Sequence, residues 1–364
     1  MNVPTTRALF EPLRFRNGAT APNRLVLAPL TNKQSHEDGT LSDEERHWLL
    51  VRADGGFGTI TTCATHVTTD GQGWEGEFGL FADTQIPSLR ALAEGVHARR
   101  ASGLVQLFHG GSRADASVSG HQPISASETE GKTPARAATH DDLERVIDAF
   151  AAAAKRAHEA GMDGVEIHGA HGYLLTQFLS ATENRRSDAF GGSLEHRARL
   201  IREVTRTVRS RVPADFVVGV RLSPEDFGNA RGLDLDESVA VARWLADDGV
   251  DFVHLSLWRA HNPTTKRPDQ HALPLFRSAL PADLPLVVAG SIWTRSEADS
   301  MLALGADAIA LGRAAIANPD WPLRAKETAT WEPKRPPLTE DELRARGLSD
   351  RFVQYMRNWK GFVT

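Results

Sequence analysis

Two histidines and a tyrosine stand close together in this chain, directly after an apolar run at residues 164–167. His168, His171 and Tyr173 are separated by glycine and alanine, which let a backbone turn sharply where a strand ends. We therefore expect the three side chains to converge on one pocket. Imidazole and phenol groups donate hydrogen bonds and exchange protons, and imidazole also binds metals, so the cluster predicts chemistry on a small molecule.

The surrounding residues narrow the chemistry of this cluster. A catalytic zinc takes about three protein ligands, and we expect the nearest carboxylate, Glu166, on the opposite face of its strand, which disfavours a metal site. Schiff-base chemistry needs a lysine, and no lysine ends a predicted strand. Hydrogen-bond or acid–base catalysis and a purely structural role are the readings that stay open.

Composition excludes several classes of partner. The 364 residues carry a net charge of −5 with scattered basic residues, so we expect no nucleic-acid partner. The single cysteine, Cys63, precludes an intramolecular disulfide and is expected to be a buried thiol. No apolar run approaches the roughly 18 residues of a membrane span, and the N-terminus lacks a signal-peptide core, so we expect no membrane partner and a cytoplasmic location.

Eight short apolar runs are predicted to form strands, and segments with helical periodicity lie between most of them. The predicted strands are residues 25–28, 59–63, 104–107, 164–167, 217–221, 252–257, 286–289 and 308–311. The predicted helices include residues 141–160, 193–210, 234–248 and 296–304. This alternation predicts an α/β fold, a single (β/α)8 TIM barrel over residues 1–330. Residues 331–364 are predicted to form a C-terminal linker and helical tail.

Three further patterns bear on the barrel. Before Asp163, Asp251 and Asp307 a glycine ends a helix, and the acidic residue leads into the next strand. Residues 112–139 are too long for an ordinary loop, so we expect them to extend over the barrel mouth after the third strand. A Gly-x-Gly-x-x-Gly pattern at residues 71–76 is not followed by a helical segment, so it predicts a plain loop and no dinucleotide site.

The active site of such a barrel lies at the carboxyl ends of its strands, so residues that follow the apolar runs are candidates. Beside the His168 cluster these are Pro29, Leu30, Thr31, Ala64, Gln106, His109, Arg221, Gly290, Ser291, Gly312 and Arg313. The last two strand ends commonly bind phosphate in this fold, and Arg313 adds a charged donor there. We expect a phosphorylated ligand. A flavin-free lyase or isomerase of a phosphorylated small molecule is one function that fits.

These residues resemble the Old Yellow Enzyme family of FMN-dependent ene-reductases over nearly the whole chain. The resemblance rests on motifs in the same order, at residues 9–12, 23–31, 106–109, 168–173, 178–180, 184–193 and 312–313. It implies a barrel that binds FMN at its mouth. NADPH or NADH would bind transiently and reduce the flavin. It also implies a small-molecule substrate with an activated alkene, an α,β-unsaturated carbonyl or nitro compound, reduced by hydride from flavin N5 and protonated from the opposite face.

The resemblance further implies a role for each candidate residue. The two histidines would bind the substrate oxygen, and the tyrosine would protonate the α-carbon. Gln106 would bind the pyrimidine edge of the flavin, Arg221 would stabilise charge near its N1, and Thr31 would lie beside its C4 oxygen. The phosphate would lie on Gly290, Ser291, Gly312 and Arg313, with Pro29, Leu30 and Ala64 also at the cofactor.

A departure from the family pattern and a further resemblance concern other residues. The family often has an arginine soon after the third-strand histidine, whereas here residues 110–112 separate His109 from Arg113, whose role stays open. Residues 354–359 resemble a C-terminal tail that reaches a neighbouring subunit in one branch of the family. We therefore expect a homo-oligomer formed through this tail, with Arg357 and Trp359 at the interface.

Overall fold

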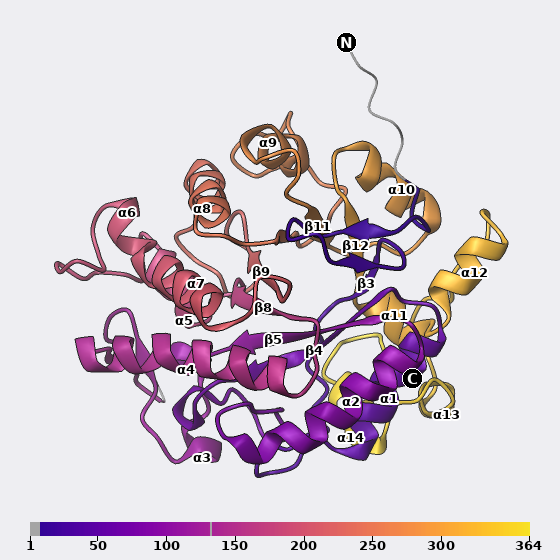
Figure 1. Cartoon of the computed structure of the whole chain (residues 1–364), viewed down its shortest axis with the longest axis horizontal. Coiled ribbons are helices and arrows are strands. Elements are labelled where there is room, and N and C mark those ends of the chain that lie inside the picture. The colour runs from indigo at the N-terminus through magenta and orange to yellow at the C-terminus, as the bar shows by residue number, and fades with distance from the viewer. Residues whose placement is uncertain (1–7, 132) are drawn as a thin grey trace.

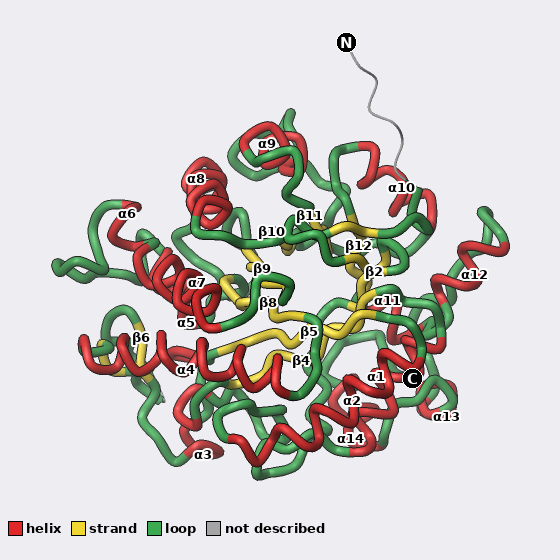
Figure 2. Tube along the Cα trace, viewed as in Figure 1, coloured by secondary structure: helices red, strands yellow, loops and turns green. Residues whose placement is uncertain are grey.

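Eight parallel strands close into a barrel at the centre of the molecule, and helices surround it (Figures 1 and 2). The structure, a computed structural model, describes residues 8–131 and 133–364. Around the barrel the strands are β3 (Leu25–Leu27), β4 (Thr59–His66), β5 (Ser102–Phe108), β8 (Gly164–Gly169), β9 (Val217–Leu222), β10 (Phe252–Ser256), β11 (Leu286–Ala289) and β12 (Ala308–Leu311). The predicted barrel is confirmed, and each predicted strand overlaps one of these.

The longer helices alternate with the strands along the chain and form the outer layer. They are α1 (Asp43–Asp54), α2 (Ile86–Ala98), α4 (His140–Glu159), α7 (Arg199–Arg211), α8 (Leu235–Asp247), α9 (Ala272–Ala279) and α10 (Arg295–Ala303). The shorter helices are α3 (Ala116–Ser119), α5 (Leu174–Leu179), α6 (Leu194–Arg197), α11 (Arg313–Ala317), α12 (Trp321–Glu327), α13 (Glu340–Arg344) and α14 (Asp350–Met356). Single 3-10 turns form at Thr69–Gly71, Asp83–Gln85 and Gly111–Arg113.

One predicted helix is wrong in extent. Residues 193–210 form two helices, α6 and α7, which meet at Ala198. Next to the junction, the buried Arg197 donates hydrogen bonds to the carbonyls of Gly192 and Leu179 at 3.1 and 2.5 Å. These contacts with the preceding loop and with α5 anchor α6 independently of α7, and helical periodicity does not encode them.

The acidic residues that lead into strands set the register of the barrel. Asp163, Asp251 and Asp307 each accept a hydrogen bond from a backbone N–H at or beside the start of a neighbouring strand, at 2.7, 2.8 and 2.8 Å. The glycine two residues before each aspartate has a positive φ, the left-handed conformation that ends the preceding helix. The recurrent sequence pattern is therefore a repeated device that joins a helix end to the adjacent strand.

A hairpin closes the barrel at the amino-terminal ends of its strands. Strands β1 (Leu13–Arg14) and β2 (Thr20–Ala21) pair antiparallel, and their buried side chains pack against inward-facing residues such as Val217 and Phe252. A second short pair, β6 (Ile124–Ser125) and β7 (Arg136–Ala137), lies within the long segment 112–139, where β6 contacts α5. Because the hairpin closes one end, only the carboxyl ends of the strands leave an open mouth.

The C-terminal segment packs onto the outer helices of the barrel. In Figure 1, α13 and α14 lie near α1 and α2. The Phe352 ring meets the Trp48 ring of α1 edge to face at 5.3 Å, and Arg52 donates to the Arg346 carbonyl at 2.8 Å. Leu338, Leu343 and Phe352 are fully buried. This packing brings residues from α14 to the barrel mouth.

Candidate functional site

The turn after β8 has a strained backbone that places its side chains. His171 adopts φ +66°, a conformation uncommon outside glycine, and its N–H donates to Ser223 Oγ at 3.1 Å. Gly172 has φ +76°, and a Cβ there would lie 2.4 Å from the carbonyl oxygen of Asn229. Only glycine fits, so the turn directs His171 and Tyr173 to the mouth in one arrangement.

The hydrogen bonds around the two imidazoles assign their tautomers. The N–H of Ala170 donates to His168 Nδ1 at 3.3 Å, so the proton of the neutral ring lies on Nε2. His168 Nε2 is 3.2 Å from His171 Nδ1 and donates to it, which leaves His171 Nε2 to donate to Ser256 Oγ at 2.7 Å. Burial, reinforced by the charge of Arg221, holds the pKa of both histidines well below the usual value. Both rings are therefore neutral hydrogen-bond donors.

Tyr173 is enclosed by aromatic rings on one side and an arginine on the other. Its ring meets Phe108 edge to face at 4.5 Å and His168 at 5.2 Å. The Arg113 guanidinium lies 4.2 Å from the centre of the Tyr173 ring and donates to the carbonyl of His171 at 2.8 Å. Burial raises the pKa of Tyr173, so the phenol is protonated at neutral pH. A protonated phenol thus lies beside two neutral imidazoles.

A buried polar network lies just below the mouth. Glu166 accepts from Gln106 Nε2 at 2.7 Å with one oxygen, and its other oxygen is 2.7 Å from His254 Nδ1. These residues come from β8, β5 and β10, so their side chains meet inside the barrel. Burial opposes the charged form, but His254 and Arg221 outweigh it and hold the pKa of Glu166 below its usual value. The carboxylate is the counter-charge of the buried Arg221.

The expectation for Glu166 is wrong. Residues two apart in a strand share a face, so Glu166 points to the same side as His168, into the barrel. Its oxygens are held by Gln106 and His254. Within the described part of the chain, no group of three or more His, Cys, Asp or Glu residues has a metal-binding arrangement.

One cavity of about 550 Å³ occupies the barrel mouth, a volume typical of small-molecule sites. Ten of the predicted site residues line it, namely Pro29, Leu30, Thr31, His171, Tyr173, Arg221, Gly290, Ser291, Gly312 and Arg313. His168, Gln106 and Ala64 are buried and lie outside the lining. His168 lies behind the cavity wall and is hydrogen-bonded to His171, which lines the cavity. Ala64 pairs with Gln106 of β5 at a bulge in β4.

The cavity is positively charged. Arg113, Arg221 and Arg313 line it, and no aspartate or glutamate occurs among the described residues of the lining. Arg221 donates to Ser256 Oγ at 3.1 Å, but its buried Nε finds no partner among residues 8–131 and 133–364. Arg313 donates to Ser291 Oγ at 2.6 Å. Arg221 thus has a spare buried donor, and Arg313 adds a second guanidinium at the last strand ends. Together they suit an anionic ligand.

Aromatic side chains form the outer walls. Trp258 and Phe227 lie on one side with ring centres 6.1 Å apart, and Tyr355 and Trp359 reach the cavity from the C-terminal segment. Sequence patterns did not predict Phe227, Tyr355 or Ser256 as site residues, and they assigned Trp359 to a subunit interface. Phe227, Tyr355 and Trp359 reach the mouth through tertiary packing, whereas Ser256 is the last residue of β10. Flat walls of this kind suit a planar ligand.

Two predicted residues of the C-terminal segment have different surroundings. Arg357 forms an ion pair with Glu340 of α13 and lies outside the cavity lining. Trp359 lines the cavity with 44% of its surface exposed. The Tyr355 hydroxyl lies beside Thr31 and Trp359, whose hydrogen bonds partly offset the burial that raises its pKa. The segment therefore belongs to the site of its own chain.

Among the described residues of the long segment 112–139, Arg113 is the one that lines the cavity. The glycine pattern at residues 71–76 forms a 3-10 turn and a loop, and the helix that follows, α2, begins only at Ile86. This is not the arrangement of a dinucleotide-binding loop, which opens directly into a helix. No helix of the described chain is both long and apolar enough to cross a lipid bilayer.

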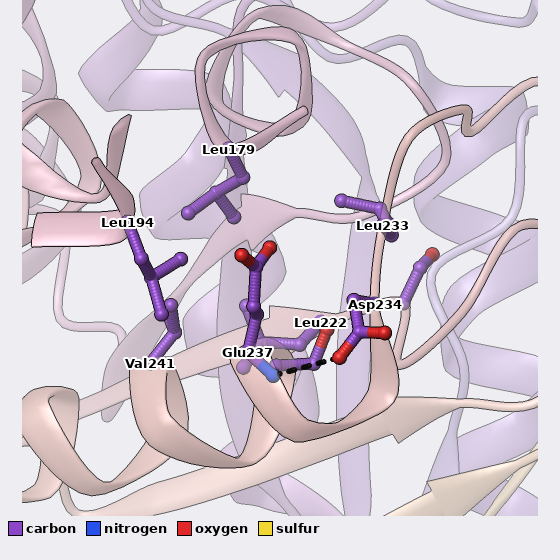
Figure 3. A pocket seen from close by; sticks show the side chains of 9 residues that line it. Leu179, Leu194, Leu222, Leu233, Asp234, Glu237 and Val241 are labelled. Atoms are coloured by element: carbon purple, nitrogen blue, oxygen red, sulfur yellow. Dashed lines mark hydrogen bonds between the residues drawn. The ribbon is translucent and has the colours of Figure 1, made fainter. Parts of the chain in front are cut away.

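A second pocket lies outside the barrel, between the end of β9 and α8 (Figure 3). Leu179, Leu222 and Val241 line it, and the Glu237 carboxylate points into it. That carboxylate is paired with Arg197 at 2.7 Å. The free volume of about 10 Å³ is near the minimum for one water molecule, so this pocket holds no substrate.

Comparisons with known proteins assign the chain to a family. Residues 8–332 match the sequence profile of the NADH:flavin oxidoreductase / NADH oxidase family. The chain is 36% identical to a probable NADH-dependent flavin oxidoreductase of Bacillus subtilis, over 89% of each protein. It is 32% identical to an NADPH dehydrogenase of Bacillus licheniformis, over 88% of this chain and 94% of that one.

Solved structures give the same result. An Old Yellow Enzyme homologue from Zymomonas mobilis superposes with a TM-score of 0.82 and 31% identity, covering 94% of this chain and 99% of the other. Morphinone reductase superposes with a TM-score of 0.79 and 27% identity over 93% of each chain. A flavin-dependent family excludes the flavin-free lyase or isomerase. The chain belongs to the NADH:flavin oxidoreductase / NADH oxidase family, that of Old Yellow Enzyme, and is an FMN-dependent NAD(P)H oxidoreductase.

Proposed function

We propose that this oxidoreductase reduces the activated C=C bond of α,β-unsaturated carbonyl or nitro compounds. The observation that carries the proposal is the pairing of two neutral imidazoles with a protonated phenol at one side of the mouth cavity. FMN, when bound, supplies two-electron chemistry by taking a hydride from reduced nicotinamide and passing it to the substrate. The side chains determine which substrate bond is reduced.

The residues of the mouth suit the flavin. Gly290, Ser291, Gly312 and Arg313 are proposed to hold its phosphate, and the spare Nε of Arg221 supports a contact with the anionic part of the ring system. Gln106 gives one of its two amide N–H groups to Glu166, so its other N–H and its carbonyl oxygen are proposed to bind the flavin. Pro29, Leu30, Thr31 and Ala64 are proposed to border the ring.

The two histidines are proposed to bind the activating oxygen of the substrate. A carbonyl oxygen gains negative charge as the β-carbon accepts hydride, and N–H donors held beside it stabilise that charge more than the ground state. His171 lies at the cavity wall, and His168 is directly behind it at 3.2 Å. Their neutral state suits this role, because each ring keeps one N–H and neither has to lose a proton.

Tyr173 is proposed to complete the reaction by giving its phenolic proton to the α-carbon of the enolate. The O–H bond breaks as the C–H bond forms, and the phenolate then regains a proton from water. The phenol faces the same cavity as His171, which supports delivery to a substrate bound there. Hydride addition and protonation on opposite faces of the alkene would give one stereochemical product.

We further propose the wider setting of the enzyme. Residues 1–330, of which residues 1–7 lie outside the described part of the chain, are proposed to form the catalytic barrel. Residues 331–364 are proposed to form a linker and helical tail that also joins subunits of a homo-oligomer in the cytoplasm. Exposure of the Trp359 ring supports the interface. Sedimentation of the wild type and of Trp359→Ala tests this, and a wild-type protein that sediments as a monomer would contradict it.

Two measurements test the reaction. The purified protein is expected to show flavin absorbance, which NADH or NADPH bleaches in the absence of oxygen. Addition of cyclohex-2-enone should then restore the absorbance and yield cyclohexanone, whereas cyclohexanone itself should not. Reoxidation by oxygen but by no enone or nitroalkene would leave a flavin-dependent oxidase and overturn the proposal.

A further inference from the structure

Arg113 has no role in the reaction described so far, yet it contacts both His171 and Tyr173. Its guanidinium donates to the His171 carbonyl at 2.8 Å and lies 4.2 Å from the centre of the Tyr173 ring. This distance is within the range of cation–π contacts. The same side chain lines the cavity. Arg113 therefore joins the left-handed turn at His171 to the face of the phenol.

The loop that carries Arg113 is locked to the turn from the inside. Gln177 of α5 is fully buried, and its Oε1 accepts from the N–H of Ser112 at 3.1 Å. Its Nε2 donates to the carbonyl of Gly172 at 2.8 Å. Gly111 has φ +64°, and a Cβ there would lie 2.3 Å from Gln177 Oε1. One glutamine thus holds the Arg113 loop and the Tyr173 turn at a set separation.

Arg113 is not held in an ion pair with a carboxylate. Arg113 forms no ion pair within the described part of the chain, whereas Arg136 of β7, in the same long segment, is paired with Asp142 at 2.5 Å. Burial is the largest influence on Tyr173 and raises its pKa, and the charge of Arg113 is the next influence and lowers it. The cation therefore acts on the phenol at close range.

We propose that Arg113 is a positioning residue for proton transfer: it fixes the His171–Tyr173 turn and presents its charge to the phenol, so that the phenolate left after protonation of the α-carbon is stabilised. The inference rests on the proposed function of Tyr173. It explains why an exposed arginine is held against this ring by a hydrogen bond to the His171 carbonyl. Water entering the cavity returns the proton to the phenolate and completes the cycle.

The first test reads the phenol directly. The chain has two tyrosines, so biosynthetic labelling with 3-fluorotyrosine gives two 19F signals, which Tyr173→Phe and Tyr355→Phe assign. Arg113→Gln is expected to move the titration of the Tyr173 signal to higher pH and to leave the Tyr355 signal in place. Arg231→Gln is the matched control, because Arg231 is an exposed loop arginine that also donates to backbone carbonyls, at 2.7 and 2.8 Å. An unchanged Tyr173 titration in Arg113→Gln overturns the proposal.

The second test reads the reaction. In stopped-flow reoxidation of the reduced enzyme by cyclohex-2-enone, Arg113→Gln should slow product formation about tenfold at pH 7, because a weaker acid transfers its proton more slowly. Arg113→Lys keeps the charge and should recover part of the rate. In a Tyr173→Phe background, Arg113→Gln should have little further effect. A full tenfold loss in that background would mean that Arg113 acts elsewhere.

The two tests separate this inference from the proposed function. If the wild type reduces no enone, the proposed function fails, while the 19F titration still reports whether Arg113 acts on the phenol. If Arg113→Gln does not fold with FMN, Arg113→Lys serves in both tests. Arg113→Lys is expected to keep the Tyr173 titration near the wild-type position, and the uncharged variant Arg113→Met serves for comparison. An equal displacement of the titration in both variants contradicts the role of the charge.

Discussion

The neutral state of His168 and His171 follows from where they lie. Both rings are enclosed beside the fixed charge of Arg221, which disfavours a second positive charge. Each ring nitrogen has an assigned partner, from the Ala170 N–H at one end to Ser256 Oγ at the other. A substrate oxygen can therefore be bound by reorienting these N–H groups, without a change of protonation.

We predict that His168→Ala keeps FMN but loses enone reduction. The variant removes one of the two N–H donors proposed to bind the substrate oxygen, and removal of one such donor typically costs about 10²-fold or more. Stopped-flow measurement of the two half-reactions should show a slow reoxidation by cyclohex-2-enone and near-normal reduction by NADPH. Phenol binding, followed by the flavin absorbance, should weaken in parallel. An equal loss of both half-reactions would contradict this division of roles.

The buried His66 makes stability depend on pH. Burial lowers its pKa to about 3, whereas an unfolded chain titrates near 6.5. Because the unfolded state binds the proton more tightly, this contribution is complete above about pH 6.5 and is lost as the pH falls. We expect His66 to reduce the free energy of unfolding by about 2 kcal/mol between pH 7 and pH 5. Urea titrations at both pH values, with His66→Gln for comparison, measure this, and an identical pH dependence in the two proteins would contradict it.

At the scale of the elements, the site depends on two turns that only glycine can form. Gly172 ends the turn after β8, and Gly111 begins the loop after β5 that carries Arg113. Both are in the left-handed region, and in both an added Cβ would collide with a fixed neighbour. Gln177 connects the two turns. The spacing between imidazole, phenol and guanidinium is therefore a property of the backbone.

We predict that Gly172→Ala destabilises the protein by more than the cost of the left-handed backbone alone, which is about 1–2 kcal/mol. Gly192→Ala is the matched control, because Gly192 has φ +85° and open space around its Cβ position. Urea unfolding should show the larger loss for Gly172→Ala, together with loss of enone reduction while Gly192→Ala stays active. Equal losses of stability would show that the clash with Asn229 relaxes.

At the scale of the whole molecule, the C-terminal segment connects the outer surface to the mouth. Its helix α14 packs Phe352 against Trp48 of α1, and the residues that follow bring Trp359 into the cavity wall. The site is thus assembled from segments more than 300 residues apart, since Pro29 and Trp359 line the same cavity. Stability of the barrel and closure of the site are coupled.

We predict that Phe352→Ala lowers the free energy of unfolding by about 3–5 kcal/mol, the range for removal of a buried aromatic ring. The displaced helix should also weaken FMN binding, measured by fluorescence of released flavin. Gln354→Ala, at an exposed position of the same helix, should change stability by less than about 0.5 kcal/mol. Unchanged flavin affinity in Phe352→Ala would show that the segment does not support the site.

The sequence by itself determined the barrel and ten of the residues that line the cavity. Apolar runs are local signals, and in this fold the residues that follow them meet at one end, so Thr31, Arg221 and Arg313 could be assigned to the mouth in advance. The tertiary structure decided what the sequence pattern could not. Glu166 faces inward to Gln106 and His254, Arg113 lies on Tyr173, and Tyr355 and Trp359 complete the wall. These are contacts between distant segments, and no local periodicity records which side chains will meet across the closed barrel.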